Sequence, residues 1–105
     1  MTWVDLGPAD FADGELRDAV VGDLHLGLTR AGNAWHAFEV WCTHAECPLT
    51  DGWLEGAAVR CACHGALFDL ETGTPLEGPA EDPISIFSVR EVAGRVEAQV
   101  PATEN

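Results

Sequence analysis

The chain has 105 residues, 47% of them hydrophobic, with 18 acidic side chains against five basic ones and a formal net charge of −13. This length and composition indicate one folded domain with a modest core and argue against wholesale disorder. The charge argues against nucleic acid and anionic membranes as partners, because both would repel the chain. No apolar run approaches the roughly 20 residues needed to cross a bilayer, and residues 1–5 lack a signal-peptide pattern. We therefore expect a soluble, cytoplasmic protein.

In chain order, the predicted elements are strands. Residues 3–6 form a first strand, and residues 16–21 and 24–30 form a hairpin around Gly22 and Asp23, with leucines alternating along its second arm. Residues 34–41 form a further strand that runs directly into a cysteine. Residues 84–92 and 95–100 flank an Ala-Gly turn and predict a closing hairpin.

The segment 42–83 differs from its surroundings, because glycine, proline and acidic residues recur in it and only short runs, such as 58–60 and 66–70, could pair as strands. A long loop-rich segment is unusual in a compact domain unless something ties it down, and a bound metal centre would do so. The sequence therefore predicts an all-β fold over residues 1–105 as a single domain. An antiparallel scaffold, resembling a sandwich or barrel, would carry an inserted metal-binding subdomain over about 42–83.

Two short clusters supply the candidate metal ligands. Cys42 and His44 form a C-x-H pair, and Cys61 and His64 form a C-x-x-H pair farther along the chain. Two sulfur and two nitrogen ligands suit either zinc or a [2Fe–2S] cluster in which histidines replace two cysteines. C-x-H gives little slack for both ligands to reach one zinc ion, whereas two irons let the cysteines hold one metal and the histidines the other. The pattern favours the iron–sulfur cluster, with a zinc-stabilised binding module as the less favoured alternative.

These clusters resemble the two ligand boxes of Rieske proteins. Residues 49–56 and 68–73 are similar to the segments between and after the boxes in soluble Rieske-type ferredoxins of aromatic-ring-hydroxylating dioxygenase systems. Within that group the chain looks most like the ferredoxins of carbazole-type dioxygenases. The small Rieske-like subunit of a nitrite reductase is the alternative, although some such subunits lack the ligands that are complete here.

The resemblance implies a Rieske fold and an electron carrier that is not itself an enzyme. A flavoprotein reductase would take electrons from NAD(P)H and pass them singly to this chain. The chain, expected to be a monomer, would then reduce the Rieske centre of a terminal oxygenase. In the family the histidine ligands face the partner, which implies that His44 and His64 form the face through which electrons leave, with the Gly78-Pro79 loop beside the cluster.

Two departures from the quinol-oxidising relatives bear on the redox potential. Where those proteins carry a serine and a tyrosine whose hydroxyls bond to sulfur, this chain has Ala66 and Phe68. Fewer donors to sulfur stabilise the added electron less, which indicates the low end of the Rieske range, about −150 mV. Cys47 and Cys63 stand where those relatives have a disulfide, and we expect the two sulfurs to be close whether or not they are bonded.

The acidic residues are concentrated around the ligands. Residues 42–83 contain one basic residue, Arg60, and eight acidic ones: Glu46, Asp51, Glu55, Asp69, Glu71, Glu77, Glu81 and Asp82. This distribution indicates either a solvated surface or electrostatic steering toward partners with positive docking faces.

Overall fold

The computed structural model describes residues 2–31, 34–42, 47–63, 65–78 and 82–101. In these segments the chain forms three antiparallel sheets and one short 3-10 helix, and they contain no α-helix. The all-β prediction is therefore confirmed. The described elements are β1 (Thr2–Pro8), β2 (Leu16–Val21), β3 (Leu24–Ala31), β4 (Ala34–Glu39), η1 (Leu49–Asp51), β5 (Trp53–Glu55), β6 (Ala58–Arg60), β7 (Leu67–Asp69), β8 (Pro75–Glu77), β9 (Ile86–Phe87), β10 (Val89–Val92) and β11 (Arg95–Val100). Within these segments there is no helix long and apolar enough to cross a membrane.

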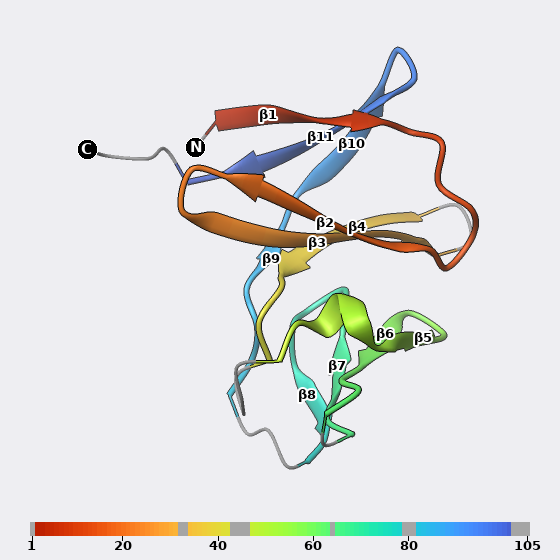
Figure 1. The fold of residues 1–105 in the computed structure, drawn as a ribbon, viewed down its shortest axis with the longest axis vertical. Helices are drawn as coiled ribbons and strands as arrows, with labels where there is room; N and C mark the ends of the chain where they lie inside the picture. Colours follow the sequence, from red (N-terminus) through yellow and green to blue (C-terminus); the bar gives the residue numbers. More distant parts are fainter. Residues whose placement is uncertain (1, 32–33, 43–46, 64, 79–81, 102–105) are drawn as a thin grey trace.

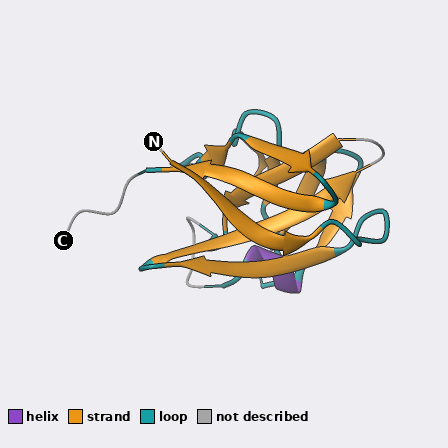
Figure 2. Ribbon diagram, turned by 90° about the horizontal axis from the view of Figure 1, so that it is seen from above, coloured by secondary structure: helices purple, strands orange, loops and turns teal. Residues whose placement is uncertain are grey.

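Two of the sheets form the scaffold, with strand orders β1-β11-β10 and β2-β3-β4-β9, in the upper half of Figure 1. Every second residue of β11 is buried, namely Val96, Ala98 and Val100, as the period of two in a strand requires. These side chains pack in one core with others from both sheets, including Leu26, Leu28 and Phe87. Seen from above, the strands of the two sheets lie over one another (Figure 2).

The third sheet, β5-β6-β7-β8, lies below the scaffold in Figure 1 and belongs entirely to the predicted insert. The chain enters it from β4 and returns through β9, and these two strands pair with each other. The segment that leads from the insert back to β9 is tied to the insert by a hydrogen bond, in which the Ile84 amide donates to the Gly73 carbonyl at 3.0 Å. Gly73 has φ +82°, and a Cβ there would lie 2.2 Å from the Ile84 carbonyl oxygen, so both conformation and space favour glycine.

Gly27 and Phe38 connect the scaffold with this lower part. The two residues are paired across β3 and β4, and a Cβ on Gly27 would lie 2.4 Å from the Phe38 ring. Because Gly27 has no side chain, the ring can sit fully buried over it. Phe38 packs with the buried cysteines of the insert, so one scaffold strand contributes to the core beneath the candidate site.

The predicted closing hairpin is correct only in part. Residues 89–92 pair with β11 as expected, but Ile86 and Phe87 pair with β4 in the other sheet. The chain changes sheets at Ser88, whose carbonyl accepts a hydrogen bond from the Gln99 amide at 2.8 Å. The sequence also gave no indication of strands β5 and β8.

Candidate metal centre

The first candidate loop follows β4 and is closed at its neck by backbone hydrogen bonds. The Cys42 amide donates to the Cys47 carbonyl at 3.0 Å, and the Leu49 amide donates to the Val40 carbonyl at 2.6 Å. Trp41 and Pro48 form an antiparallel bridge between these pairs. Cys42 and Cys47 are thereby fixed opposite each other. His44 lies outside the described residues.

The second loop follows β6 and is closed in a similar way. The Cys61 amide donates to the Ala66 carbonyl at 2.7 Å, and the Gly65 amide donates back to the Cys61 carbonyl at 3.1 Å. Gly65 has φ +80°, a left-handed conformation that suits glycine at the end of a tight loop. This pair of bonds fixes Cys61 at the start of the loop. His64, like His44, is not among the described residues.

A disulfide joins the two loops. Cys47 and Cys63 are bonded, with Cα atoms 6.4 Å apart, and they are separated by 16 positions in sequence. The sulfur of Cys61 lies within 4.8 Å of both bonded sulfurs. The sequence placed Cys47 and Cys63 near each other and left the bond open, and the structure contains the bond.

Cys42 and Cys61 are the two cysteines outside the disulfide. Both are buried, with 4% and 1% exposure, and they share a core with Leu49, Ala66 and Phe68. The donor set fits an iron–sulfur cluster: one thiol stands at the neck of each loop, and the disulfide removes the remaining two sulfurs from competition as thiolate ligands. Ala66 and Phe68 are fully buried in the same core, and neither side chain has a hydroxyl that could bond to the sulfurs.

Arg60, which immediately precedes Cys61, is the centre of a side-chain network that the sequence did not reveal. Its guanidinium forms a bidentate pair with Glu55, both N···O distances being 2.7 Å, and contacts Glu77 at 2.9 Å. It also donates to the Gly65 carbonyl at 2.8 Å. The hydrogen bond from Arg60, followed by one from Trp53, lowers the pKa of Glu55 from 4.5 to about 2. The hydrogen bonds to Glu55 and then Glu77 raise the pKa of Arg60.

This network could not be found from sequence spacing, because its members come together only through the pairing of four strands. In the sequence Arg60 is simply the single cation of an acidic segment. An arginine directly before a candidate ligand was the one available signal.

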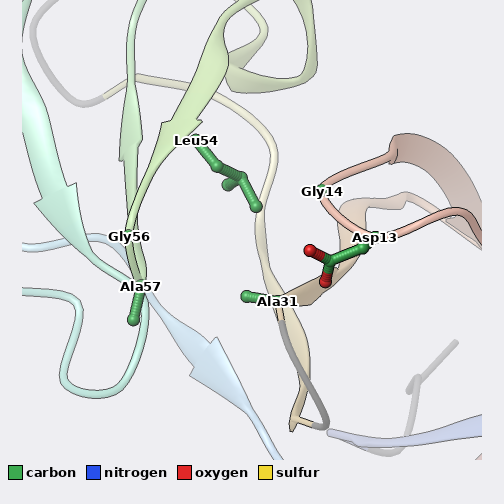
Figure 3. A pocket seen from close by; sticks show the side chains of 6 residues that line it. All are labelled: Asp13, Gly14, Ala31, Leu54, Gly56 and Ala57. Atoms are coloured by element: carbon green, nitrogen blue, oxygen red, sulfur yellow. The ribbon is translucent and has the colours of Figure 1, made fainter.

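An open depression of about 460 Å³ lies between the scaffold and the third sheet (Figure 3). Asp13, Gly14 and Ala31 line it from the scaffold, and Leu54, Gly56 and Ala57 line it from the β5–β6 hairpin. None of these residues is a cysteine or histidine, and Asp13 is the one carboxylate among them. The depression is therefore separate from the cysteine site.

Comparison with known proteins decides the family. The family model described as "Rieske [2Fe-2S] domain" matches residues 2–91. The chain belongs to the Rieske [2Fe–2S] domain family. The predicted fold, family and cofactor are thereby confirmed.

The relatives of this Rieske domain include ferredoxins of dioxygenase systems. It is 32% identical over 99 residues to the anthranilate 1,2-dioxygenase ferredoxin subunit of Burkholderia cepacia, covering 93% of this chain and 92% of that protein. A solved complex of reduced oxygenase and oxidised ferredoxin in carbazole 1,9a-dioxygenase contains a chain that is 33% identical to it, with a TM-score of 0.86 and 91% coverage of both chains. The expectation of a Rieske-type ferredoxin, an electron-carrier component and not a catalyst, is confirmed.

The same fold also occurs in a nitrite reductase small subunit from Mycobacterium tuberculosis. That structure has a TM-score of 0.86 and 18% identity, and it covers 97% of both chains. At this identity the likeness extends to the fold alone.

Proposed function

We propose that this Rieske-type ferredoxin passes single electrons from a NAD(P)H-dependent flavoprotein reductase to the Rieske centre of a terminal ring-hydroxylating oxygenase. It would act in the cytoplasm, as a monomer and as a single domain over residues 1–105. The observation that carries the proposal is the pair of buried cysteines, Cys42 and Cys61, at the necks of two loops joined by a disulfide. Sequence identity of 32% and 33% to two ferredoxins of dioxygenase systems, in alignments that cover more than nine-tenths of the chain, supports it.

In this proposal Cys42 and Cys61 bind one iron and His44 and His64 bind the other. A bound [2Fe–2S] cluster accepts one electron and releases it again. The chain contributes the rest: the backbone bonds at the two necks fix the thiols, and the surrounding apolar core excludes water. Because Ala66 and Phe68 carry no hydroxyl that could bond to sulfur, the reduced state would gain less stabilisation than in the quinol-oxidising relatives, which suits electrons that come from a nicotinamide.

The ligand assignment is tested by metal analysis of single and double variants. We expect two irons per wild-type chain and loss of the cluster in Cys42→Ser, Cys61→Ser and the double variant His44→Ala/His64→Ala. His36→Ala is the matched control, because His36 lies in β4 and pairs with Thr29 of β3 inside the scaffold sheet. Zinc in the wild-type protein, or iron retained at full stoichiometry without both histidines, would overturn the assignment.

We further propose that acidic residues beside the cluster steer the partners into place. Charges act over about one Debye length, roughly 8 Å at physiological salt, so carboxylates near the loop tips should matter most. Glu46, two residues from His44, is the first choice, although it lies outside the described residues. Glu71 is the matched control, because its side chain is exposed. The second loop leads into the start of β7, whereas Glu71 follows the other end of that strand.

Stopped-flow reduction by the reductase, measured across an ionic-strength series, decides between steering and general solubility. Glu46→Lys should slow reduction at low salt and flatten its salt dependence, whereas Glu71→Lys should leave both close to wild type. Equal loss in both variants would mean that the acidity serves solubility. Re-oxidation by a ring-hydroxylating oxygenase, and not by a nitrite reductase, then tests the choice of electron acceptor.

A further inference from the structure

Arg60 connects three separate parts of the insert. Its side chain bonds to Glu55 at the end of β5, to Glu77 at the end of β8, and to the Gly65 carbonyl in the second loop. It is only 19% exposed, whereas the scaffold arginines Arg90 and Arg95 are 47% and 53% exposed. A guanidinium with partners on three elements is held much more firmly than one in an ordinary surface ion pair.

The strand register explains why the guanidinium sits where it does. Trp53 pairs with Arg60, Arg60 with Leu67, and Leu67 with Glu77, so the four side chains form a row across one face of the third sheet. Leu67, between the two charged residues, is 8% exposed. The indole of Trp53 donates to Glu55 at 3.0 Å and holds that carboxylate in position for the arginine.

The contact with Gly65 gives this network its role. The loop 61–66 is closed by two backbone bonds between its own ends, and the Arg60 side chain adds a third bond that ties its far end to the sheet. We propose that Arg60 is a positioning residue that fixes the second cluster-binding loop, with Glu55 and Glu77 bracing its guanidinium. This inference rests on the proposed function in taking Cys61, at the start of the loop, as a ligand.

Charge alone would give Arg60 a different role, and the order of the second loop distinguishes the two roles. If the arginine acted only through its positive charge, removing it would lower the midpoint potential, and removing the Glu77 carboxylate would raise the potential. Neither change would alter the order of the loop. If the arginine positions the loop, both changes weaken the same brace and both loosen the loop.

The experiment compares Arg60→Gln, Arg60→Lys and Glu77→Gln with the wild-type holoprotein. Arg95→Gln is the matched control, because Arg95 forms an ion pair with Asp5 at 2.7 Å on the scaffold. Hydrogen exchange of peptides covering 61–66 reports the order of the loop, and peptides from β3 and β4 report global stability. Iron release to a chelator and the midpoint potential are measured on the same samples.

We expect faster exchange in 61–66 for Arg60→Gln and Glu77→Gln, with exchange in β3 and β4 unchanged, and iron release faster by about tenfold for Arg60→Gln. Lysine should not rescue the loop, because one ammonium cannot replace a bidentate pair and a third bond at once. Wild-type exchange in Arg60→Gln, rescue by lysine, or equal acceleration in the scaffold would overturn the proposal. The exchange measurement does not depend on the ligand set, so absence of iron in the wild type would refute the proposed function and leave this test standing.

Discussion

Replacing Gly52 by alanine should displace the backbone on both sides of Cys61. Gly52 lies between η1 and β5, and a Cβ there would sit 1.8 Å from the Arg60 carbonyl oxygen and 3.3 Å from the Ala62 nitrogen. Such contacts are not made below 3.0 Å, so strand β6 or the Gly52 segment must move by at least 1.2 Å, the difference between 3.0 and 1.8 Å. Overpacking of this kind costs about 1–3 kcal/mol, which lowers the melting temperature of a domain of this size by about 4–24 °C.

The assay is thermal unfolding together with the iron content of the purified protein. Gly78→Ala is the control for the melting temperature, because a Cβ at Gly78 meets no atom within 4 Å and its φ is not left-handed. Gly52→Ala should melt earlier and lose iron, whereas Gly78→Ala should melt at the wild-type temperature. If the two variants behave alike, the close approach of Gly52 does not hold Cys61 in place and the reasoning fails.

Three further predictions concern the same region. Removing the disulfide with Cys47→Ala/Cys63→Ala should lower the free energy of unfolding of the oxidised protein by about 3 kcal/mol, as expected for a closed loop of this length. Denaturant unfolding of wild type and variant, with and without reductant, measures this difference. Ala66→Ser and Phe68→Tyr should each raise the midpoint potential in protein-film voltammetry, since each offers a hydroxyl in the core that holds the cysteines; no shift in either would mean that the hydroxyls do not reach sulfur. Because the pKa of Glu55 is lowered from 4.5 to about 2, its ionised form stabilises the fold fully above about pH 4.5, and this contribution is lost as the pH falls through about 2. The difference in stability between wild type and Glu55→Gln should therefore shrink over that interval, and denaturant midpoints that differ equally at pH 7 and pH 2 would contradict it.

The sequence predicted the scaffold well because its strands are long enough to show alternation. The buried positions of β11 follow the expected period of two. The leucines of β3 alternate in the sequence, but residues 26–29 are all buried, so this strand is covered on both faces at its centre and is not half-buried as expected. Strands β5 and β8 have only three residues each, and their exposed Trp53, Glu55 and Glu77 give no such pattern.

The cysteine ligands of the candidate site could be predicted, because residue type and spacing alone identify them. Cys42 and Cys61 were expected as ligands, and the structure places both in one buried core. The network around Arg60 was not predictable, because Glu77 is 17 positions away in sequence and reaches the arginine only through the register of β6, β7 and β8. Local sequence carries no information about such a pairing until the sheet is known.

Because β4 and β9 pair with each other, the chain leaves the scaffold and returns to it at adjacent positions of one sheet. The scaffold therefore holds the two ends of the insert together before any metal arrives, and the entropy of closing that long loop does not fall on the cluster. We therefore expect the two ends of the insert to stay adjacent when the cluster is removed, for as long as β4 and β9 remain paired.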